Sequence, residues 1–439
     1  MILLIFLGYL SVLLPEPSNK IIKWVEKGEI SLPYGFLYSF EDTNKIDVSI
    51  YSVVDTVNFV HFSPTFEYRI GHWRGIISPY GRYGGDYFYP KKKKFGIYSD
   101  IIRSSLFYKN DYILFSFGKD IFSIGPAFED NPLLSPNVPL NYISFTFRRN
   151  KYAFTHFISR LCNYEGVEIE WDDTTKGYVK NVNRYLGIHR VEIKPLDWIA
   201  FSFSEAMLIG EESLGLPFEL FAPFTIYYVE QYNRELNMNI LWNIDVVMIK
   251  GKFYFYFDFF IDDFQYESDP WKEPNHIGIY TGLKGRDFLK EGFELNFYYS
   301  ILTRWTYNNL IVWQRYMERD LPLGSMLGCD YDKVVLKAIY PLVSFKFGGM
   351  VSYTRRGENR ITTPWPVNTY NPPSPENEFK GTNFLSGIIE RRLTLSAIFK
   401  YEDIIELVSG VSFFQNYEHD KYKNKILPSI ELKLKLSTK

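Results

Sequence analysis

The nine residues 252–260, KFYFYFDFF, constrain the fold of this chain more than any other stretch. Phenylalanine occupies the odd positions from 253 to 259, and the even positions hold Lys252, Tyr254, Tyr256 and Asp258. Successive side chains of a strand point to opposite faces, so one face is phenylalanine and the other is polar or amphipathic. Such a strand fits a soluble sandwich with the phenylalanines in its core, or a membrane barrel with the phenylalanines against lipid.

The same alternation recurs along most of the chain after residue 45. Further examples are residues 142–148, 167–172, 190–194, 199–204, 294–301 and 430–436. Central strands of a large soluble sheet are buried on both faces and are apolar throughout, whereas here the second face is repeatedly charged. A closed barrel also removes sheet edges, which a membrane-embedded sheet cannot leave open. We therefore predict an all-β fold, a large antiparallel transmembrane β-barrel of roughly 16–18 strands over residues 45–439.

Composition agrees with this choice. Tyrosine (35 residues) and phenylalanine (38 residues) bring the aromatic content to 19%, and these residues form lipid-facing bands and interfacial girdles. The hydrophobic content of 46% is near the average of soluble proteins, which argues against a helical membrane protein. A formal net charge of -2 gives no electrostatic basis for binding nucleic acid, so no such partner is expected.

The amino terminus differs from the rest of the chain. Residues 1–14, MILLIFLGYLSVLL, are almost wholly apolar but too few to span a bilayer as a helix. They predict a secretory signal peptide, although a basic start and a small-x-small cleavage site are missing; a buried first helix is the alternative. Residues 15–44 are expected to form a short helix over 19–29, which ends near Gly28, and an extended segment.

Three long segments interrupt the strands. Residues 123–140 are rich in proline, residues 215–236 predict a short helix after Pro223, and residues 355–383 predict a long loop. Long loops of a membrane barrel belong outside the cell, and short turns belong in the periplasm. We predict that loop and helix segments plug the lumen. Residues 123–140 are expected to fold inward, because Leu133 and Leu134 would be poorly placed in water.

Several short motifs, in order, resemble those of the Wzi family of outer-membrane capsule-assembly proteins. They are WVEKGEI at 24–30, GKD at 118–120, GP at 125–126, LLS-x-N-x-P at 133–139, YLGIHRVEIKP at 185–195, FSE at 203–205, HIGIYTGL at 276–283 and LGCD at 327–330. They extend over roughly residues 20–330, although Ala127 stands where the family pattern has a second glycine.

The resemblance implies an 18-stranded outer-membrane barrel, plugged inside, that holds capsular polysaccharide in a lectin-like manner. The expected partners are capsular or other surface polysaccharide, outer-membrane lipid and the outer-membrane assembly machinery, with the chain as a monomer. A porin for small solutes is the alternative function, and an outer-membrane enzyme acting on lipid or glycan is a third.

The sequence contains no catalytic, phosphate-binding or dinucleotide-binding motif, and its six histidines have no metal-ligand spacing. We therefore predict a non-enzymatic protein without cofactor or metal. The neighbouring carboxylates Asp262 and Asp263 are interpreted as solvated loop residues, and Cys162 and Cys329 as free thiols.

Two groups of site residues are predicted. Arg190, Glu192 and Lys194 share one strand face, and their alternating charges can pair across and between strands in the lumen. The predicted lumen and plug network consists of Lys119, Asp120, Arg190, Glu192, Lys194 and Glu205. Sugars favour flat aromatic rings beside carboxylates and amides. The predicted ligand-binding residues are therefore Trp271, Trp365, Glu129, Asp130 and Asn131, although a loop tryptophan can instead pack on its own loop.

Overall fold

The computed structural model describes most of the barrel. The described residues are 44–53, 57–84, 90, 92–127, 130–170, 176–212, 214–234, 236, 238–264, 275–365, 384–402 and 404–438. The predicted signal segment at 1–14, the predicted helix over 19–29, and the site candidates Glu129 and Trp271 lie outside these ranges.

One antiparallel sheet contains 19 strands, of which β4 (Lys93–Lys94) has only two residues, so 18 long strands remain. The long strands are β1 (Asn44–Val53), β2 (Val57–Ile70), β3 (Trp73–Gly84), β5 (Ile97–Lys109), β6 (Ile113–Asp120), β7 (Leu140–Arg149), β8 (Tyr152–Glu170), β9 (Lys176–Leu196), β10 (Ile199–Glu212), β11 (Met238–Lys250), β12 (Phe253–Asp263), β13 (His276–Arg286), β14 (Glu294–Leu302), β17 (Tyr331–Leu342), β18 (Phe345–Arg356), β19 (Glu390–Tyr401), β20 (Ile405–Gln415) and β21 (Lys425–Thr438).

The remaining elements are short. Strands β15 (Met317–Glu318) and β16 (Leu321–Pro322) form a separate ladder, and the helical elements are η1 (Phe218–Phe221), α3 (Tyr227–Arg234), η2 (Val312–Gln314) and η3 (Tyr417–His419). Among the described residues, no helix has the length and apolarity needed to cross a membrane.

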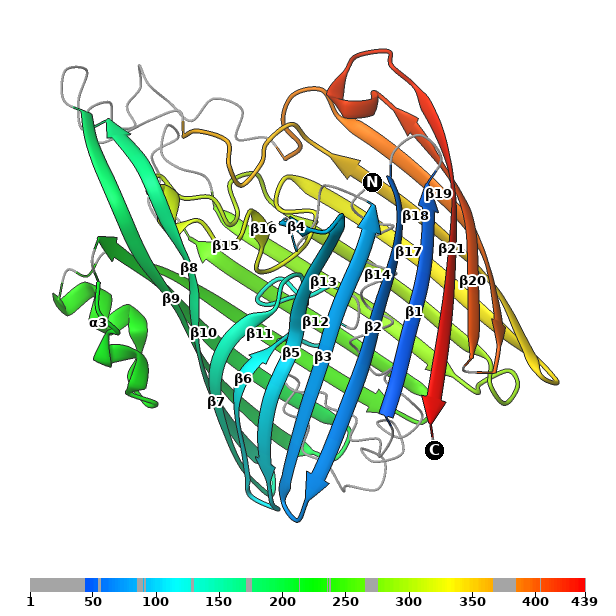
Figure 1. Ribbon diagram of the computed structural model, residues 1–439, viewed down its shortest axis with the longest axis horizontal. Coiled ribbons are helices and arrows are strands. Elements are labelled where there is room, and N and C mark those ends of the chain that lie inside the picture. The colour runs from blue at the N-terminus through cyan, green and yellow to red at the C-terminus, as the bar shows by residue number, and fades with distance from the viewer. Residues whose placement is uncertain are drawn as a thin grey trace.

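The long strands pair with their neighbours in chain order, and the first strand also pairs with the last. Val48 of β1 lies opposite Phe62 of β2 on one side and opposite Leu434 of β21 on the other. Figure 1 shows the blue β1 beside the red β21 in a curved wall of tilted strands. The predicted all-β antiparallel barrel of about 18 strands is therefore confirmed.

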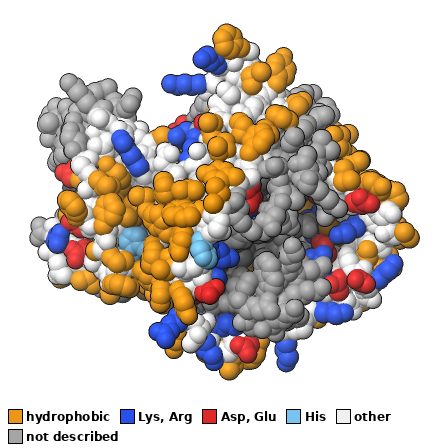
Figure 2. Space-filling view, turned by 60° about the horizontal axis from the view of Figure 1, so that its bottom comes forward, with side chains coloured by type: hydrophobic (Ala, Val, Ile, Leu, Met, Phe, Trp, Pro, Cys, Tyr) orange, Lys and Arg blue, Asp and Glu red, His pale blue; other side chains and the backbone are white. Residues whose placement is uncertain are grey.

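Strand β12 shows which face of the sheet points outward. Tyr254, Tyr256 and Asp258 are buried, whereas Phe253 and Phe257 are each 39% exposed. Strands β7 and β19 alternate in the same way between buried and exposed positions. The phenylalanines therefore lie outside and the polar residues inside, as predicted. In Figure 2, hydrophobic side chains form a broad area on the visible face, with most charged groups around it.

The two ends of the barrel differ. At one end most strands are joined by turns of two or three residues, at 71–72, 110–112, 150–151, 197–198, 251–252, 343–344 and 402–404, and residues 287–293 form a longer connection. Large exposed aromatic residues adjoin several of these turns, namely Trp73, Tyr112, Tyr152, Trp198 and Tyr340. A ring of aromatic residues beside short turns is typical of a membrane interface at the periplasmic end. Most of the loops at the opposite end are longer.

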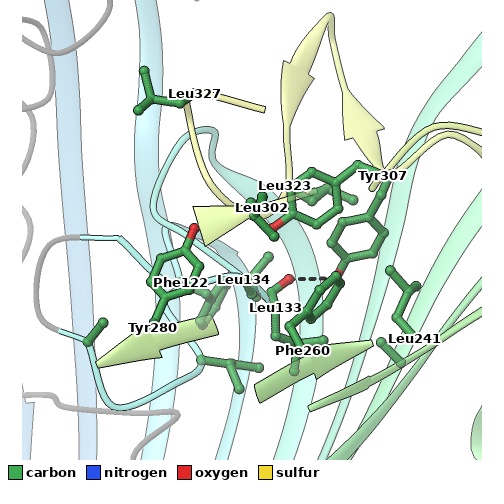
Figure 3. Close-up of a cluster of buried hydrophobic side chains, with 14 of the residues drawn as sticks. Phe122, Leu133, Leu134, Leu241, Phe260, Tyr280, Leu302, Tyr307, Leu323 and Leu327 are labelled. Carbon is green, nitrogen blue, oxygen red and sulfur yellow. Dashed lines mark hydrogen bonds between the residues drawn. The ribbon is translucent and has the colours of Figure 1, made fainter. Parts of the chain in front are cut away.

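Two of the long loops fill the barrel. The first follows β6 and includes residues 121–127 and 130–139, and the second comprises residues 303–330. Their apolar side chains join inward-facing residues of the strands in one cluster, part of which Figure 3 shows. Members from the loops include Phe122, Leu133, Leu134, Tyr307 and Leu323, and members from the strands include Leu241, Phe260, Tyr280 and Leu302. The predicted inward folding of the proline-rich segment is therefore confirmed for its described residues.

Candidate functional site

The carboxylate of Asp130 joins the two loops inside the barrel. Ser325 Oγ donates to Asp130 Oδ2 at 2.6 Å, and the backbone N–H of Met326 donates to Oδ1 at 3.4 Å. The hydroxyl groups of Tyr331 and Tyr280 lie 3.4 and 3.5 Å from the same carboxylate. Burial raises the pKa of the Asp130 carboxyl, while the hydrogen bond from Ser325 opposes the shift. The geometry gives Asp130 a structural contact between the loops.

Asn131, the neighbouring ligand candidate, shapes the first loop internally. Its side chain is 1% exposed. Its Nδ2 donates to Ser123 Oγ at 2.6 Å and to the carbonyl of Ala127 at 2.7 Å, and its Oδ1 accepts the Ala127 N–H at 2.9 Å. A β-carbon at Gly125, where φ is +138°, would lie 2.3 Å from Asn131 Oδ1. The Gly-Pro sequence thus allows a tight loop around Asn131, whose side chain is enclosed.

Arg190 lies at the centre of the predicted lumen network. Its guanidinium donates to Glu192 Oε1 at 2.9 Å and to both carboxylate oxygens of Asp245 at 2.7 and 3.0 Å. It also donates to Ser204 Oγ at 3.0 Å. The three charged side chains are almost completely buried. This bidentate pair links β9 to β11 across β10, so it fixes the inner wall.

Lys119, Asp120 and Lys194 belong to other ion pairs. Asp120 accepts two hydrogen bonds from Arg103, at 2.7 and 3.2 Å, and Lys119 pairs with Asp100. Lys194 Nζ lies 3.9 Å from the exposed Asp197 beside a short turn. The structure therefore does not bring these three residues together with Arg190.

Glu205 points to the opposite face of the wall. In the register of β9 and β10, Ser204 lies opposite Arg190, whereas Glu205 lies opposite His189. The Glu205 carboxylate accepts the backbone N–H groups of Tyr227 and Tyr228 at 2.8 and 3.0 Å. Its assignment to the lumen network is therefore wrong. Side chains of a strand alternate with a period of two, so a shift of one position moves a side chain from the lumen face to the outer face.

Trp365 lies among aromatic residues of the long-loop end. Its ring centroid is 5.8 Å from that of Trp305 and 6.0 Å from that of His276. The Arg304 guanidinium lies 5.0 Å from the Trp305 ring centroid. Trp305 is buried and Trp365 is partly exposed. Trp365 thus packs on another loop and keeps part of its surface accessible to solvent.

Two residues that hold the plug, Arg184 and Asp262, were not predicted to do so from the sequence. Arg184 donates to the carbonyl groups of Trp313, Arg315 and Met317 at 2.6 to 2.9 Å. Arg184 and Arg190 are six residues apart on β9, and an even separation places both side chains on the lumen face. This spacing was the signal that the sequence offered. Asp262 accepts the N–H of Tyr307 at 2.6 Å and is buried, so its interpretation as a solvated loop residue is wrong.

The described part of the chain contains no group of three or more His, Cys, Asp or Glu side chains placed to hold a metal ion. The two cysteines, Cys162 and Cys329, are free thiols, as predicted.

Comparisons with known proteins agree with the barrel geometry. The chain is similar to the structure of Wzi from Escherichia coli, described as an outer membrane protein involved in group 1 capsule assembly and as a carbohydrate binding β-barrel. The identity is 14%, the TM-score is 0.55, and the match covers 89% of this chain and 84% of that one. At this identity the likeness shows the fold alone.

Two further solved structures are similar at lower scores. OccK10 (OpdN) of Pseudomonas aeruginosa has 9% identity, a TM-score of 0.47, and coverage of 91% of this chain and 100% of that one. OccAB1 of Acinetobacter baumannii has 9% identity, a TM-score of 0.47, and coverage of 91% and 97%. No curated protein sequence matches the chain.

A family model described as "Capsule assembly protein Wzi" matches residues 98–404, which is more than half of the chain. The match includes both plug loops, the Arg190 network and Trp365. The chain therefore belongs to the Wzi family of capsule assembly proteins.

Proposed function

We propose that this protein is an outer-membrane β-barrel that binds capsular or other surface polysaccharide and retains it on the cell surface without catalysing a reaction. The observation that carries the proposal is the filled lumen. Two loops occupy the barrel and are tied to its wall by buried hydrogen bonds, such as Tyr316 Oη to the carbonyl of Leu133 at 2.8 Å. A barrel whose lumen is filled by its own loops suits a surface receptor better than an open pore.

The long-loop end supplies the proposed binding surface. In membrane barrels this end faces the cell exterior. Trp365 offers a partly exposed aromatic surface there, supported by Trp305. Sugar rings stack their CH faces on such surfaces while their hydroxyls bind polar neighbours. Trp271, Glu129 and Asp130 stay part of the proposed surface. Asp130 is partly exposed as a residue, although its carboxylate is engaged between the two loops. The enclosed side chain of Asn131 supports a scaffold role instead.

Polar contacts hold the surrounding loops in place. Asn308 Nδ2 donates to the carbonyl of Thr363 at 2.8 Å, and the Arg360 guanidinium lies 2.7 Å from the ring nitrogen of His419. Asp330 accepts the N–H groups of Asn359 and Ser386, both at 3.1 Å. Three separate loops are thereby joined around the proposed surface. A rigid surface of this kind lowers the ordering cost of binding a polymer.

A deletion strain provides the test. Cells without this protein are expected to release polysaccharide into the medium and to carry less of it. Complementation with the native chain is expected to restore the bound fraction, and complementation with Trp365→Ala is expected to restore it only in part. Trp198→Ala, at the opposite end of the barrel, serves as the matched control and should behave as the native chain does. Unchanged cell-bound polymer in the deletion strain would contradict the proposal.

A porin for small solutes is the second candidate. It is favoured only by the size of the barrel, since 18 long strands are enough to surround an aqueous channel. Planar-bilayer recordings separate the two functions. Ohmic conductance of the native protein, similar to that of an open channel, would favour the porin. Conductance close to that of the bare bilayer, together with recovery of the protein in a polysaccharide pull-down, would favour the receptor.

A further inference from the structure

The segment between β10 and β11 covers the outside of the barrel wall. Leu220 and Tyr227 from this segment pack in one cluster with outward-facing residues of the strands, which include Ile158, Met207 and Ile209. In Figure 1, α3 stands outside the sheet beside β9 and β10. The segment therefore differs from the two plug loops, which fill the inside.

Beneath this segment, the outer wall carries a short row of polar side chains. His156 lies opposite His189 in the register of β8 and β9, and His189 lies opposite Glu205 in that of β9 and β10. On the next strands the same row continues as Trp242 and Ile261. The row thus returns to apolar residues on β12, where the outer face is rich in phenylalanine. Polar groups at this level require cover, because hydrocarbon offers them no hydrogen-bond partner.

The segment supplies that cover through specific contacts. The Tyr227 ring stacks on His189 with centroids 4.2 Å apart and an interplanar angle of 21°. Glu205 accepts the first backbone N–H groups of α3, where the helix dipole favours a carboxylate. Trp242 Nε1 donates to the same carboxylate at 3.2 Å. His156, His189 and Glu205 are consequently at most 7% exposed.

The opposite side of the segment is unusually apolar and exposed. Phe218, Phe224 and Tyr232 are 86%, 83% and 80% exposed, and Ile226 is 59% exposed. Large apolar side chains exposed together on one short segment mark a binding or membrane-contact face. It adjoins the outer wall at Phe154 of β8, whose ring centroid lies 5.1 Å from that of Phe224. Phe154 lies opposite the exposed Phe147 of β7, so the segment continues into the lipid-facing wall.

We propose that residues 216–234 form a membrane-embedded cover, whose exposed apolar face binds the acyl chains of the surrounding lipid bilayer. The cover lets the wall keep two histidines and a glutamate on its outer side, in a row that is flanked by Phe145 of β7 and Ile261 of β12. The inference rests on the proposed outer-membrane location, and it assigns to this segment a contact that differs from polysaccharide binding. Continuity with the lipid-facing wall favours lipid over a protein partner.

Nitroxide accessibility tests this assignment on the full chain in vesicles of phosphatidylethanolamine and phosphatidylglycerol. Single cysteines are introduced by Phe224→Cys in the cover, by Phe203→Cys on the barrel wall, and by Tyr422→Cys in the loop between β20 and β21. All variants also carry Cys162→Ser, and that parent, which retains the buried Cys329, measures background labelling. Heat-modifiable gel migration confirms that each variant is folded.

The label at position 224 is expected to match position 203, with high accessibility to oxygen and low accessibility to a water-soluble nickel chelate. Position 422 should show the reverse. High nickel accessibility at 224 together with lipid-like behaviour at 203 would overturn the cover alone. Water-like behaviour at both 203 and 224 would overturn the membrane location as well. Strong spin–spin coupling between labels at 224 in dilute vesicles would show a second copy of the chain on this face, and would also overturn the proposal.

Discussion

The hydroxyl of Ser325 donates a 2.6 Å hydrogen bond to the carboxylate of Asp130, a residue 195 positions earlier in the chain, and this contact connects the two plug loops. Around it, Asn137 Nδ2 donates to the carbonyl groups of Pro322 and Gly324 at 2.7 and 2.6 Å. The two loops therefore form one plug. The first loop contacts the second along its length, so loss of either loop should open the lumen.

Replacing residues 123–139 by a short glycine–serine linker tests the plug directly. The expected result is a rise in single-channel conductance, because the cluster around Leu133 and Leu134 no longer fills the barrel. The measurement is planar-bilayer recording of the purified variant. Shortening the loop at 417–423, which lies outside the plug cluster, is the control and should leave conductance unchanged. Equal conductance of the plug variant and the native protein would contradict the plug.

Arg190→Ala should strongly destabilise the barrel. The substitution leaves Asp245 and Glu192 buried without their cation, and breaking such a pair costs about 3–5 kcal/mol. The expected outcome is a lower urea midpoint for unfolding from lipid vesicles. Arg160→Ala removes an exposed arginine from the adjacent strand and serves as the matched control. If the two substitutions shifted the midpoint equally, the buried network would not support the wall.

Cys329 should resist alkylation in the folded protein. Burial raises the pKa of its thiol to about 12, and the neighbouring Asp330 adds to the shift. A raised thiol pKa means that the thiolate, which is the reactive form, is scarce at pH 8 and still scarce at pH 10. In a Cys162→Ser protein, a maleimide is expected to react only after unfolding, as read by mass spectrometry. Rapid labelling of the folded Cys162→Ser protein at pH 8 would show that the second plug loop opens readily.

Trp365→Ala should weaken binding of purified polysaccharide. The expected loss in affinity is roughly two- to twelvefold, because an aromatic contact contributes about 0.5–1.5 kcal/mol. Trp365→Phe keeps a flat ring and should retain part of the affinity. Trp198→Ala should bind polysaccharide with the affinity of the native chain. Biolayer interferometry on detergent-solubilised protein provides the measurement. Full affinity in Trp365→Ala would move the proposed binding surface away from this residue.

Glu205→Ala should loosen the outer cover. Its carboxylate holds two N–H groups of α3 and the indole of Trp242, so its removal frees the start of the helix. A nitroxide at position 224 is expected to become more mobile in its spectrum. Glu219→Ala removes only an ion pair to the exposed Arg234 and is the matched control. Unchanged mobility in Glu205→Ala would mean that apolar packing alone holds the cover.

The alternation of side chains determined much of this protein from sequence alone. In residues 252–260 the phenylalanines and the polar residues occupy opposite faces, and repetition of that pattern requires a closed wall with an apolar exterior. The prolines and leucines of residues 123–140 likewise indicated an inward loop. Arg190 and Glu192 were correctly placed on one face, because a strand sends residues i and i+2 to the same side, and there they form an ion pair.

Only the tertiary structure decided what covers each face. Glu205 follows the two-residue period onto the outer wall, where a polar residue is tolerated because residues 216–234 fold over it. No local pattern shows that a distant segment provides such cover. The second plug loop could not be predicted from the sequence for a similar reason. Ser325 contacts Asp130 only because the barrel brings the two loops together. Local periodicity fixes the direction of a side chain, and long-range packing fixes the partner that it finds there.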